Sequence, residues 1–221
     1  MRPLSGCGVV TNLVRRPVNN VNRVYGFKEP GRENMQQGLK TRLLDDTLTY
    51  DGTQLAPLWI YKNYDIQGDA MVSFIGPSDL SLRNMVDVED IKAKRAIFSQ
   101  KMVHFIGEFF DLDLEKTVYR QRILMVLMKE VLENQLNRLL IRSGDDLYDG
   151  DAKITVSIAT LSNVSTLIHA GVNISSEGTP VKTKALNDYN IEPRPFAHEV
   201  LDRFREELES CWLARCKVRS V

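Results

Sequence analysis

The chain has 221 residues, of which 43% are hydrophobic and 26% are charged, so it suits one domain with a sizeable buried core. Its 29 basic and 29 acidic residues cancel, and no overall charge draws it to nucleic acid or to an anionic membrane. The longest apolar run, residues 123–128, is far shorter than the roughly 20 residues that span a bilayer. The 3 cysteines show no metal-ligand spacing, and their odd number favours a reducing compartment. We therefore expect a cytoplasmic protein with no membrane or nucleic-acid partner.

The first 34 residues are rich in arginine, poor in acidic residues and without a sustained hydrophobic period. This composition fits a flexible arm, a targeting peptide or sequence upstream of the true start, since Met35 stands just before the first periodic segment. We expect a flexible N-terminal extension over residues 1–34 and a single domain over residues 35–221.

Apolar periodicity and turn residues predict short elements in the next part of the chain. The expected strands cover residues 40–44 and 70–75, and Gly76-Pro77 is expected to end the second. A short helix is expected behind Thr53 as its N-cap, and residues 85–91 are expected to be extended.

Helical spacing predicts three further helices. Residues 99–110 carry an apolar stripe at spacings of three and four, which favours a helix. A longer helix follows Asp113 as its cap, and on it Arg120 and Arg122 point in different directions, so that only one can face a site. The final helix, residues 196–216, is amphipathic, with Ala197, Val200, Leu201, Phe204, Leu208 and Trp212 expected to point inward.

Two alternating strands follow an acidic turn at residues 144–151, the first opening at Lys153 and the second carrying residues 165–174. If they form an antiparallel hairpin, a three-residue connection at 162–164 sets Ser157 opposite His169 and Lys153 opposite Asn173. A two-residue turn would separate these polar positions. We therefore predict one polar face that bears Lys153, Ser157, His169 and Asn173.

This face has an ordinary and a functional interpretation. A lysine at a strand start is most often a solvated end residue, and a single histidine is most often a hydrogen-bonded structural group. If Lys153 and His169 lie together in one cleft, and Gly171 lets a ligand approach the backbone, they would form a catalytic or binding site.

The run Gly150-Asp151-Ala152-Lys153-Ile154, followed by His169-Ala170-Gly171-Val172-Asn173, resembles the core of the lipoate and biotin protein ligase superfamily. More specifically, residues 39–218 are similar to the uncharacterised family catalogued as domain of unknown function 366 (DUF366). The matching segments are Ile66-Gln67-Gly68-Asp69-Ala70, Phe74-Ile75-Gly76-Pro77, Met85-Val86-Asp87-Val88-Glu89-Asp90, Arg120-Gln121-Arg122, Gly144-Asp145-Asp146-Leu147-Tyr148, Ile168-His169-Ala170-Gly171-Val172-Asn173 and Gly178-Thr179-Pro180. The resemblance implies an α/β (α+β) fold, with a mostly antiparallel sheet flanked by helices.

The resemblance also implies a function. In the superfamily the lysine contacts the carbonyl or phosphate of an acyl-adenylate or acyl donor. We expect a ligase or an acyl or group transferase acting on a carboxylate-bearing small molecule, with Lys153 as electrostatic stabiliser and His169 positioning substrate or moving a proton. The alternative is a non-catalytic protein that binds an acyl, nucleotide or purine-like ligand on the same scaffold. The expected substrate-binding residues are Gly68, Asp69, Ser73, Gly76, Pro77, Asp146, Ser157, Gly171 and Asn173.

Two departures from the superfamily limit the chemistry. The cysteines lie outside every matching segment, which argues against a covalent acyl-enzyme. Residues 68–72 contain no arginine, whereas biotin ligases carry a glycine- and arginine-rich adenylate loop there. Adenylate formation stays open, and its cofactors would be ATP and Mg²⁺, with Asp87 and Glu89 as candidate metal ligands. Solvated turn carboxylates are the common alternative to such a metal site.

Overall fold

The structure, a computed structural model, describes residues 38–93, 97–179 and 181–220. The predicted N-terminal extension, residues 1–34, lies outside the described residues. Within the described residues, no helix is long and apolar enough to cross a bilayer.

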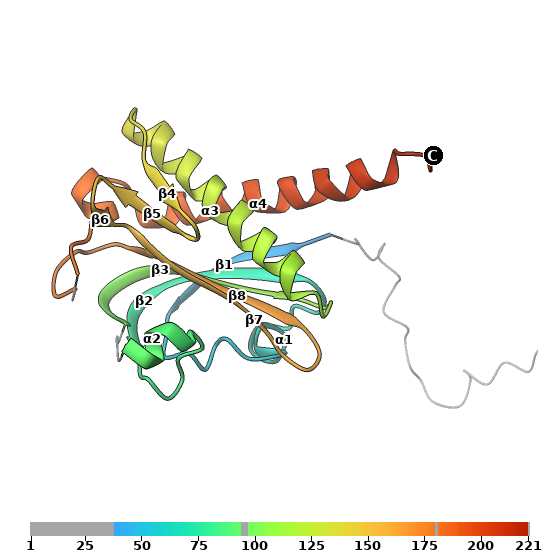
Figure 1. Ribbon diagram of the computed structural model, residues 1–221, viewed down its shortest axis with the longest axis horizontal. Coiled ribbons are helices and arrows are strands. Elements are labelled where there is room, and N and C mark those ends of the chain that lie inside the picture. The colour runs from blue at the N-terminus through green and yellow to red at the C-terminus, as the bar shows by residue number, and fades with distance from the viewer. Residues whose placement is uncertain (1–37, 94–96, 180, 221) are drawn as a thin grey trace, which may run out of the picture. The chain divides into compact units, whose positions relative to one another are not determined.

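A five-stranded sheet with strand order β1-β2-β3-β8-β7 forms the centre of the domain (Figure 1). Strands β1 and β2 are parallel, and the other neighbouring pairs are antiparallel. The sheet is therefore mostly antiparallel, as the sequence predicted. Its strands are β1 (Lys40–Thr47), β2 (Ala70–Leu80), β3 (Ile97–Phe109), β7 (Thr155–Leu161) and β8 (Thr166–Asn173).

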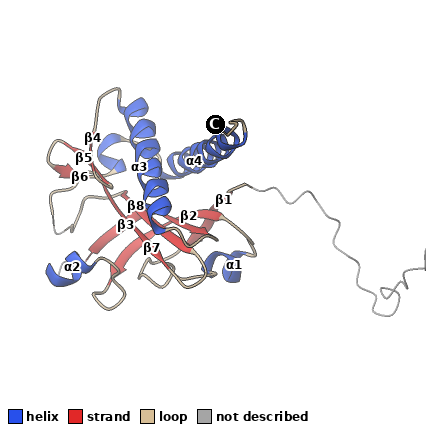
Figure 2. Cartoon of the chain, turned by 45° about the vertical axis from the view of Figure 1, so that its right-hand side comes forward, coloured by secondary structure: helices blue, strands red, loops and turns tan. Residues whose placement is uncertain are grey.

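A smaller three-stranded sheet has the order β4-β5-β6 and lies on the same side of the main sheet as α3 and α4 (Figures 1 and 2). Its strands are short, and the last two lead directly into β7. They are β4 (Ile141–Ser143), β5 (Asp146–Asp149) and β6 (Ala152–Lys153).

Two long helices, α3 (Leu114–Leu136) and α4 (Pro193–Cys216), cover one face of the main sheet (Figure 2). Their apolar sides pack on the odd-numbered side chains of β3, such as Val103 and Phe105, and form the larger core. The opposite face is covered by the segment from Leu48 to Ile66, which includes α1 (Trp59–Tyr64) and forms a second core. The remaining helices are α2 (Val88–Ala93) and a short 3₁₀ helix at Leu186–Tyr189.

The predictions for both long helices are confirmed, with two corrections. The Asp113 side chain accepts a hydrogen bond from the Lys116 amide at 2.9 Å and caps α3. Helix α4 begins at Pro193, three residues before the predicted start. Trp212, which we expected to point inward, is 45% exposed because the buried side of α4 ends at Phe204.

The helix predicted over residues 99–110 is wrong, because this segment is strand β3. A central strand with both faces covered places apolar residues at almost every position, and these match a helical spacing by chance. The extended segment predicted at 85–91 is also wrong. There the Asp87 side chain accepts hydrogen bonds from the amides of Glu89 and Asp90 at 2.7 and 3.1 Å, and α2 forms.

Two boundaries also differ from the prediction. Gly76-Pro77 does not end β2, which continues to Leu80 through a register shift at this dipeptide. The short helix begins at Trp59, because the Thr53 amide and hydroxyl both donate to Asp51 in a preceding turn.

Candidate functional site

The β7–β8 hairpin has a register one residue away from the predicted one. Leu161 pairs with Thr166, which leaves a four-residue loop at 162–165 in place of the expected three residues. The Ser162 hydroxyl accepts hydrogen bonds from the amides of Val164 and Ser165 at 3.2 and 3.0 Å, and these bonds stabilise the longer loop.

The register decides which residues share a face. Ser157 lies opposite Ala170, and His169 lies opposite Ile158. Because a shift of one residue exchanges the two faces of a strand, Ser157 faces the long helices and His169 faces the opposite side. The predicted polar face shared by Ser157 and His169 is therefore wrong.

Lys153 belongs to the small sheet, where it pairs with Tyr148. Its ammonium lies 2.8 Å from a carboxylate oxygen of Asp146, and the two side chains are 30% and 21% exposed. Burial raises the pKa of the Asp146 carboxyl above its usual value, and the charge of Lys153 opposes this shift. Both side chains are therefore partly exposed to solvent.

The neighbouring residue Asp145 connects this pair to α3 and β7. Gln121 donates one hydrogen bond to the Asp145 carboxylate at 3.1 Å and one to the Ser157 hydroxyl at 2.7 Å. The Ser157 hydroxyl donates to the Asp145 carbonyl at 2.9 Å. Arg122 forms an ion pair with the Asp145 carboxylate at 3.1 Å. We call Arg122, Gln121, Asp145, Asp146, Lys153 and Ser157 the lysine cluster.

The lysine cluster contains three of the predicted site residues, Lys153, Asp146 and Ser157. Of the two arginines of α3, Arg122 belongs to this cluster, whereas Arg120 pairs with Asp111 at 2.9 Å and lies over the Phe109 ring. Arg122 and Gln121 were missed as site residues, although the Arg120-Gln121-Arg122 run is one of the segments that carry the resemblance. Lys153 and Arg122 can each bind a carboxylate or phosphate group of a ligand if that group replaces the aspartate with which the cation is paired.

His169 lies in a buried aromatic stack on the other face of the sheet. It is 4% exposed, its ring stacks on Tyr50 at a centroid distance of 3.7 Å, and its Nε2 lies 3.2 Å from His104 Nδ1. His104 Nε2 lies 3.3 Å from the Gly76 carbonyl, which can only accept, so His104 donates there and accepts from His169. Burial lowers the pKa of His104 to about 4, and burial followed by the charge of His104 holds the pKa of His169 well below its usual value.

Gly171 provides no room for a ligand at this position. An added Cβ would lie 2.8 Å from the methyl carbon of Met102, so the Met102 side chain fills the space. Asn173 links β3 to the residue between β6 and β7, accepting from the Ser99 hydroxyl at 3.2 Å and donating to the Ile154 carbonyl at 3.3 Å. Both residues act inside the packed sheet.

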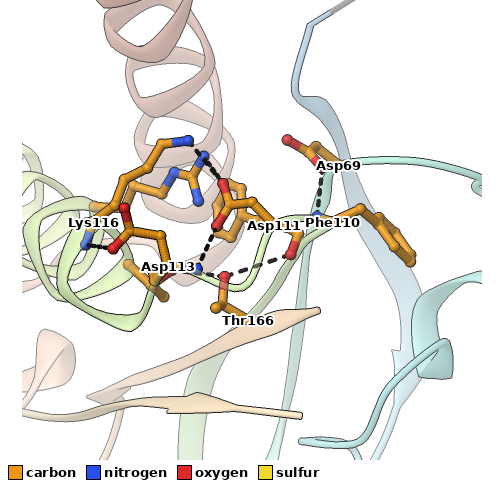
Figure 3. Close-up of polar contacts among 9 residues, drawn as sticks. Asp69, Phe110, Asp111, Asp113, Lys116 and Thr166 are labelled. Atoms are coloured by element: carbon orange, nitrogen blue, oxygen red, sulfur yellow. Dashed lines mark hydrogen bonds and ion pairs between the residues drawn. The ribbon is translucent and has the colours of Figure 1, made fainter. Parts of the chain in front are cut away.

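Gly68 and Asp69 lie at the other end of β2 from Gly76 and Pro77. The Asp69 carboxylate accepts the Phe110 amide at 2.8 Å, beside the capped start of α3 (Figure 3). Ser73 lies in the middle of β2, fully buried, with no hydrogen-bond partner for its hydroxyl in the described part of the chain. The structure does not bring these three residues to the lysine cluster.

Of the two predicted metal ligands, Asp87 is used elsewhere. The Asp87 carboxylate caps α2, and the described residues contain no group of three or more His, Cys, Asp or Glu that could hold a metal ion. Asp87 and Glu89 therefore do not fit the expected Mg²⁺ site.

Gly76 and Pro77 line a cavity of about 410 Å³ where β1, β2, β3 and the start of α4 meet. We call it the bulge pocket, because the register of β2 shifts here against both β1 and β3. Its other lining residues are Asp45, Asp46, Thr47, Ile75, Gln100, Lys101 and Arg194.

Solved structures with this arrangement of elements include a protein of unknown function from Pyrococcus horikoshi. It is 32% identical, the match covers 83% of this chain and 100% of that chain, and the TM-score is 0.80. The biotin protein ligase from Aquifex aeolicus, solved with biotin and ATP, has a TM-score of 0.53 at 16% identity, with 78% of this chain and 71% of that chain covered. At that identity the likeness shows the fold alone.

Two sequence comparisons place the chain in a family. An uncharacterised protein from Methanocaldococcus jannaschii is 42% identical over 153 residues, which are 66% of this chain and 69% of the relative. The family model described as domain of unknown function (DUF366) matches residues 39–219. The chain therefore belongs to the DUF366 family and has the fold of the biotin and lipoate protein ligases.

Proposed function

We propose that this protein is a ligase or an acyl or group transferase that acts on a carboxylate-bearing small molecule, with Lys153 as electrostatic stabiliser. The observation that carries the proposal is the Lys153–Asp146 pair. The ammonium is 30% exposed, and Asp146 is its one ion-pair partner among the described residues. The carboxylate of Asp146 occupies the position that an acyl or phosphate oxygen of a substrate would take.

The surroundings of the pair favour exchange with a substrate. Burial raises the pKa of Asp146, which means that its ionised form is disfavoured compared with a carboxylate in water. A substrate anion that replaces Asp146 at Lys153 therefore displaces a carboxylate whose charged form is already disfavoured by burial. In a site with little water, the ammonium stabilises charge on a reacting oxygen more strongly than it would in solvent.

Arg122 adds a second cation for a longer substrate. It pairs with Asp145, which is next to Asp146 in the chain, and Gln121 holds Asp145 in place. One ligand could thus place its carboxylate and a phosphate on the two cations. ATP would supply an adenylyl group to the substrate carboxylate, with release of pyrophosphate. The proposal gives His169 no contact with substrate, because it is buried on the other face.

ATP–pyrophosphate exchange over a panel of carboxylic acids tests this proposal. We expect exchange with at least one acid, and a loss of about 10²- to 10³-fold in Lys153→Ala, the range for removing one stabilising donor. Lys182→Ala is the matched control, because Lys182 pairs with Asp151 at 2.6 Å with side chains 69% and 77% exposed. The control should exchange at the wild-type rate.

Equal exchange in wild type and Lys153→Ala would refute the role of Lys153. No exchange with any acid, together with tight ligand binding by both forms, would refute the enzyme and support the alternative. That alternative is a protein that binds an acyl, nucleotide or purine-like ligand without chemistry. It is favoured by the burial of His169, since the second expected catalytic group does not accompany Lys153. Mass spectrometry of small molecules retained on purification would identify the ligand in either case.

A further inference from the structure

The bulge pocket is formed where extra residues interrupt two strand pairs. Along β1, the chain advances from Leu43 to Thr47 while β2 advances only from Ser73 to Ile75. Along β3, the chain covers Ser99 to Met102 while β2 covers only Ser78 to Gly76. The extra residues fall within 44–46 and 100–101, and most of the polar lining comes from these ranges, namely Asp45, Asp46, Gln100 and Lys101. Bulges re-aim side chains and are enriched beside functional sites.

The floor of the pocket is rigid. An added Cβ on Gly76 would lie 1.8 Å from the Leu48 carbonyl oxygen, so the two backbone segments are in direct contact. The Gly76 carbonyl accepts from His104, and the Pro77 carbonyl accepts from the Tyr50 amide at 2.9 Å. These contacts fix the walls of the pocket before any ligand enters.

The charges in the pocket are not all compensated. Arg194 pairs with Asp45 at 2.6 Å and donates to the Leu44 carbonyl at 3.3 Å, so its charge is used to attach α4 to β1. Lys101 is exposed and makes no side-chain hydrogen bond or ion pair with any described residue. Asp46 accepts a hydrogen bond from the neutral Tyr64 hydroxyl and has no cationic partner in the described ranges.

We propose that the bulge pocket binds a small zwitterion, of which an α-amino acid is the simplest case. Lys101 binds the carboxylate of the ligand, Asp46 binds its ammonium group, and Ile75 and Pro77 contact its side chain. A ligand with only one charge would leave either Lys101 or Asp46 without a partner. The cavity of about 410 Å³ lies within the usual range for small-molecule sites. None of its lining residues belongs to the lysine cluster, so this site goes beyond the proposed function.

NMR titration of the isotopically labelled full chain with the common L-amino acids tests the proposal. The best amino acid is then compared with its matched carboxylic acid, which lacks the amino group, and its matched amine, which lacks the carboxylate. We expect the amino acid to bind at least about tenfold more tightly than either fragment. The largest shifts are expected at the backbone amides of Thr47 and Gly76.

Two variants locate the site. Lys101→Gln and Asp46→Asn should each weaken binding of the amino acid by about tenfold or more, the usual effect of losing a charged hydrogen-bond partner. Both side chains are exposed, so both variants should keep the wild-type Tm, and Lys182→Gln should bind as wild type does.

Three results would overturn the proposal. They are no binding of any amino acid up to about 10 mM, equal binding of the matched carboxylic acid, and unchanged binding in Lys101→Gln. None of them depends on ATP–pyrophosphate exchange, so a failure of the proposed function is distinguishable from a failure of this site.

Discussion

At the scale of single residues, the two buried histidines form a pair in which burial favours the neutral form of both rings. His104 donates to the Gly76 carbonyl and accepts from His169, which uses each nitrogen of His104 once. A proton added to His104 Nδ1 would face the N–H of His169. Burial lowers both pKa values, and the hydrogen bond from His104 to the Gly76 carbonyl opposes only part of this shift at His104.

This pair predicts a loss of stability in mild acid. Both folded-state pKa values are lowered. Below the usual histidine pKa, these histidines are therefore protonated in the unfolded chain but stay neutral in the folded chain. Each histidine then lowers the free energy of unfolding by up to about 1.4 kcal/mol per pH unit as the pH falls below ~6.5, and for His104 this continues to about pH 4. We expect His169→Phe to reduce the slope by that amount, because phenylalanine keeps the stack on Tyr50 but cannot titrate. Urea unfolding at several pH values measures it, and equal slopes in the two proteins would contradict the prediction.

The candidate site residues show which parts of the site could be predicted from the sequence and which could not. Of the predicted residues, Lys153 pairs with Asp146, and Ser157 contacts the adjacent Asp145. His169 was assigned to the same face because the hairpin loop was taken to have three residues. The hydrogen bonds of Ser162 that select four residues depend on side-chain geometry, which periodicity does not contain.

At the scale of elements, strand β2 requires a glycine at position 76, where its backbone contacts the Leu48 backbone. We predict that Gly76→Ala lowers the free energy of unfolding by about 3 kcal/mol, because the added Cβ would lie 1.8 Å from a backbone oxygen that cannot rotate away. Gly38→Ala is the control, since an added Cβ there meets nothing within 4 Å, and it should change stability by less than about 0.5 kcal/mol. Urea unfolding of both variants makes the comparison. A stable Gly76→Ala would mean that the Leu48 segment moves freely.

Elements with one solvent-exposed face were predicted well from the sequence, and elements buried on both faces were not. Helix α4 keeps polar residues on its outer side, so its period of 3.6 residues is visible in the sequence. Strand β3 lies between two covered faces, and residues 102–109 are all buried, so its period of two is hidden. Helix α2 was missed for another reason, because its six residues are too few to show a period and its cap at Asp87 decides its structure.

At the scale of the whole molecule, the main sheet and the family match begin at neighbouring residues. The family model starts at residue 39, and β1 starts at Lys40, whose amide donates to the Asp69 carbonyl at 3.0 Å. Strand β1 then supplies the edge of the sheet and, through Asp45, the ion pair that holds the start of α4. Stability should therefore depend on β1 and not on the residues before it.

Two truncated chains test this prediction. The chain 35–221 should unfold in one cooperative transition, with a free energy of unfolding within about 0.5 kcal/mol of the full chain. The chain 48–221 is the control. It lacks β1, so it exposes the edge of β2, removes Leu44 from the second core and leaves Arg194 without Asp45. We expect it to lose cooperative unfolding, because an unpaired buried strand edge leaves backbone groups without partners. If removing residues 1–34 costs as much as removing β1, the boundary lies earlier, and the first 34 residues belong to the folded domain.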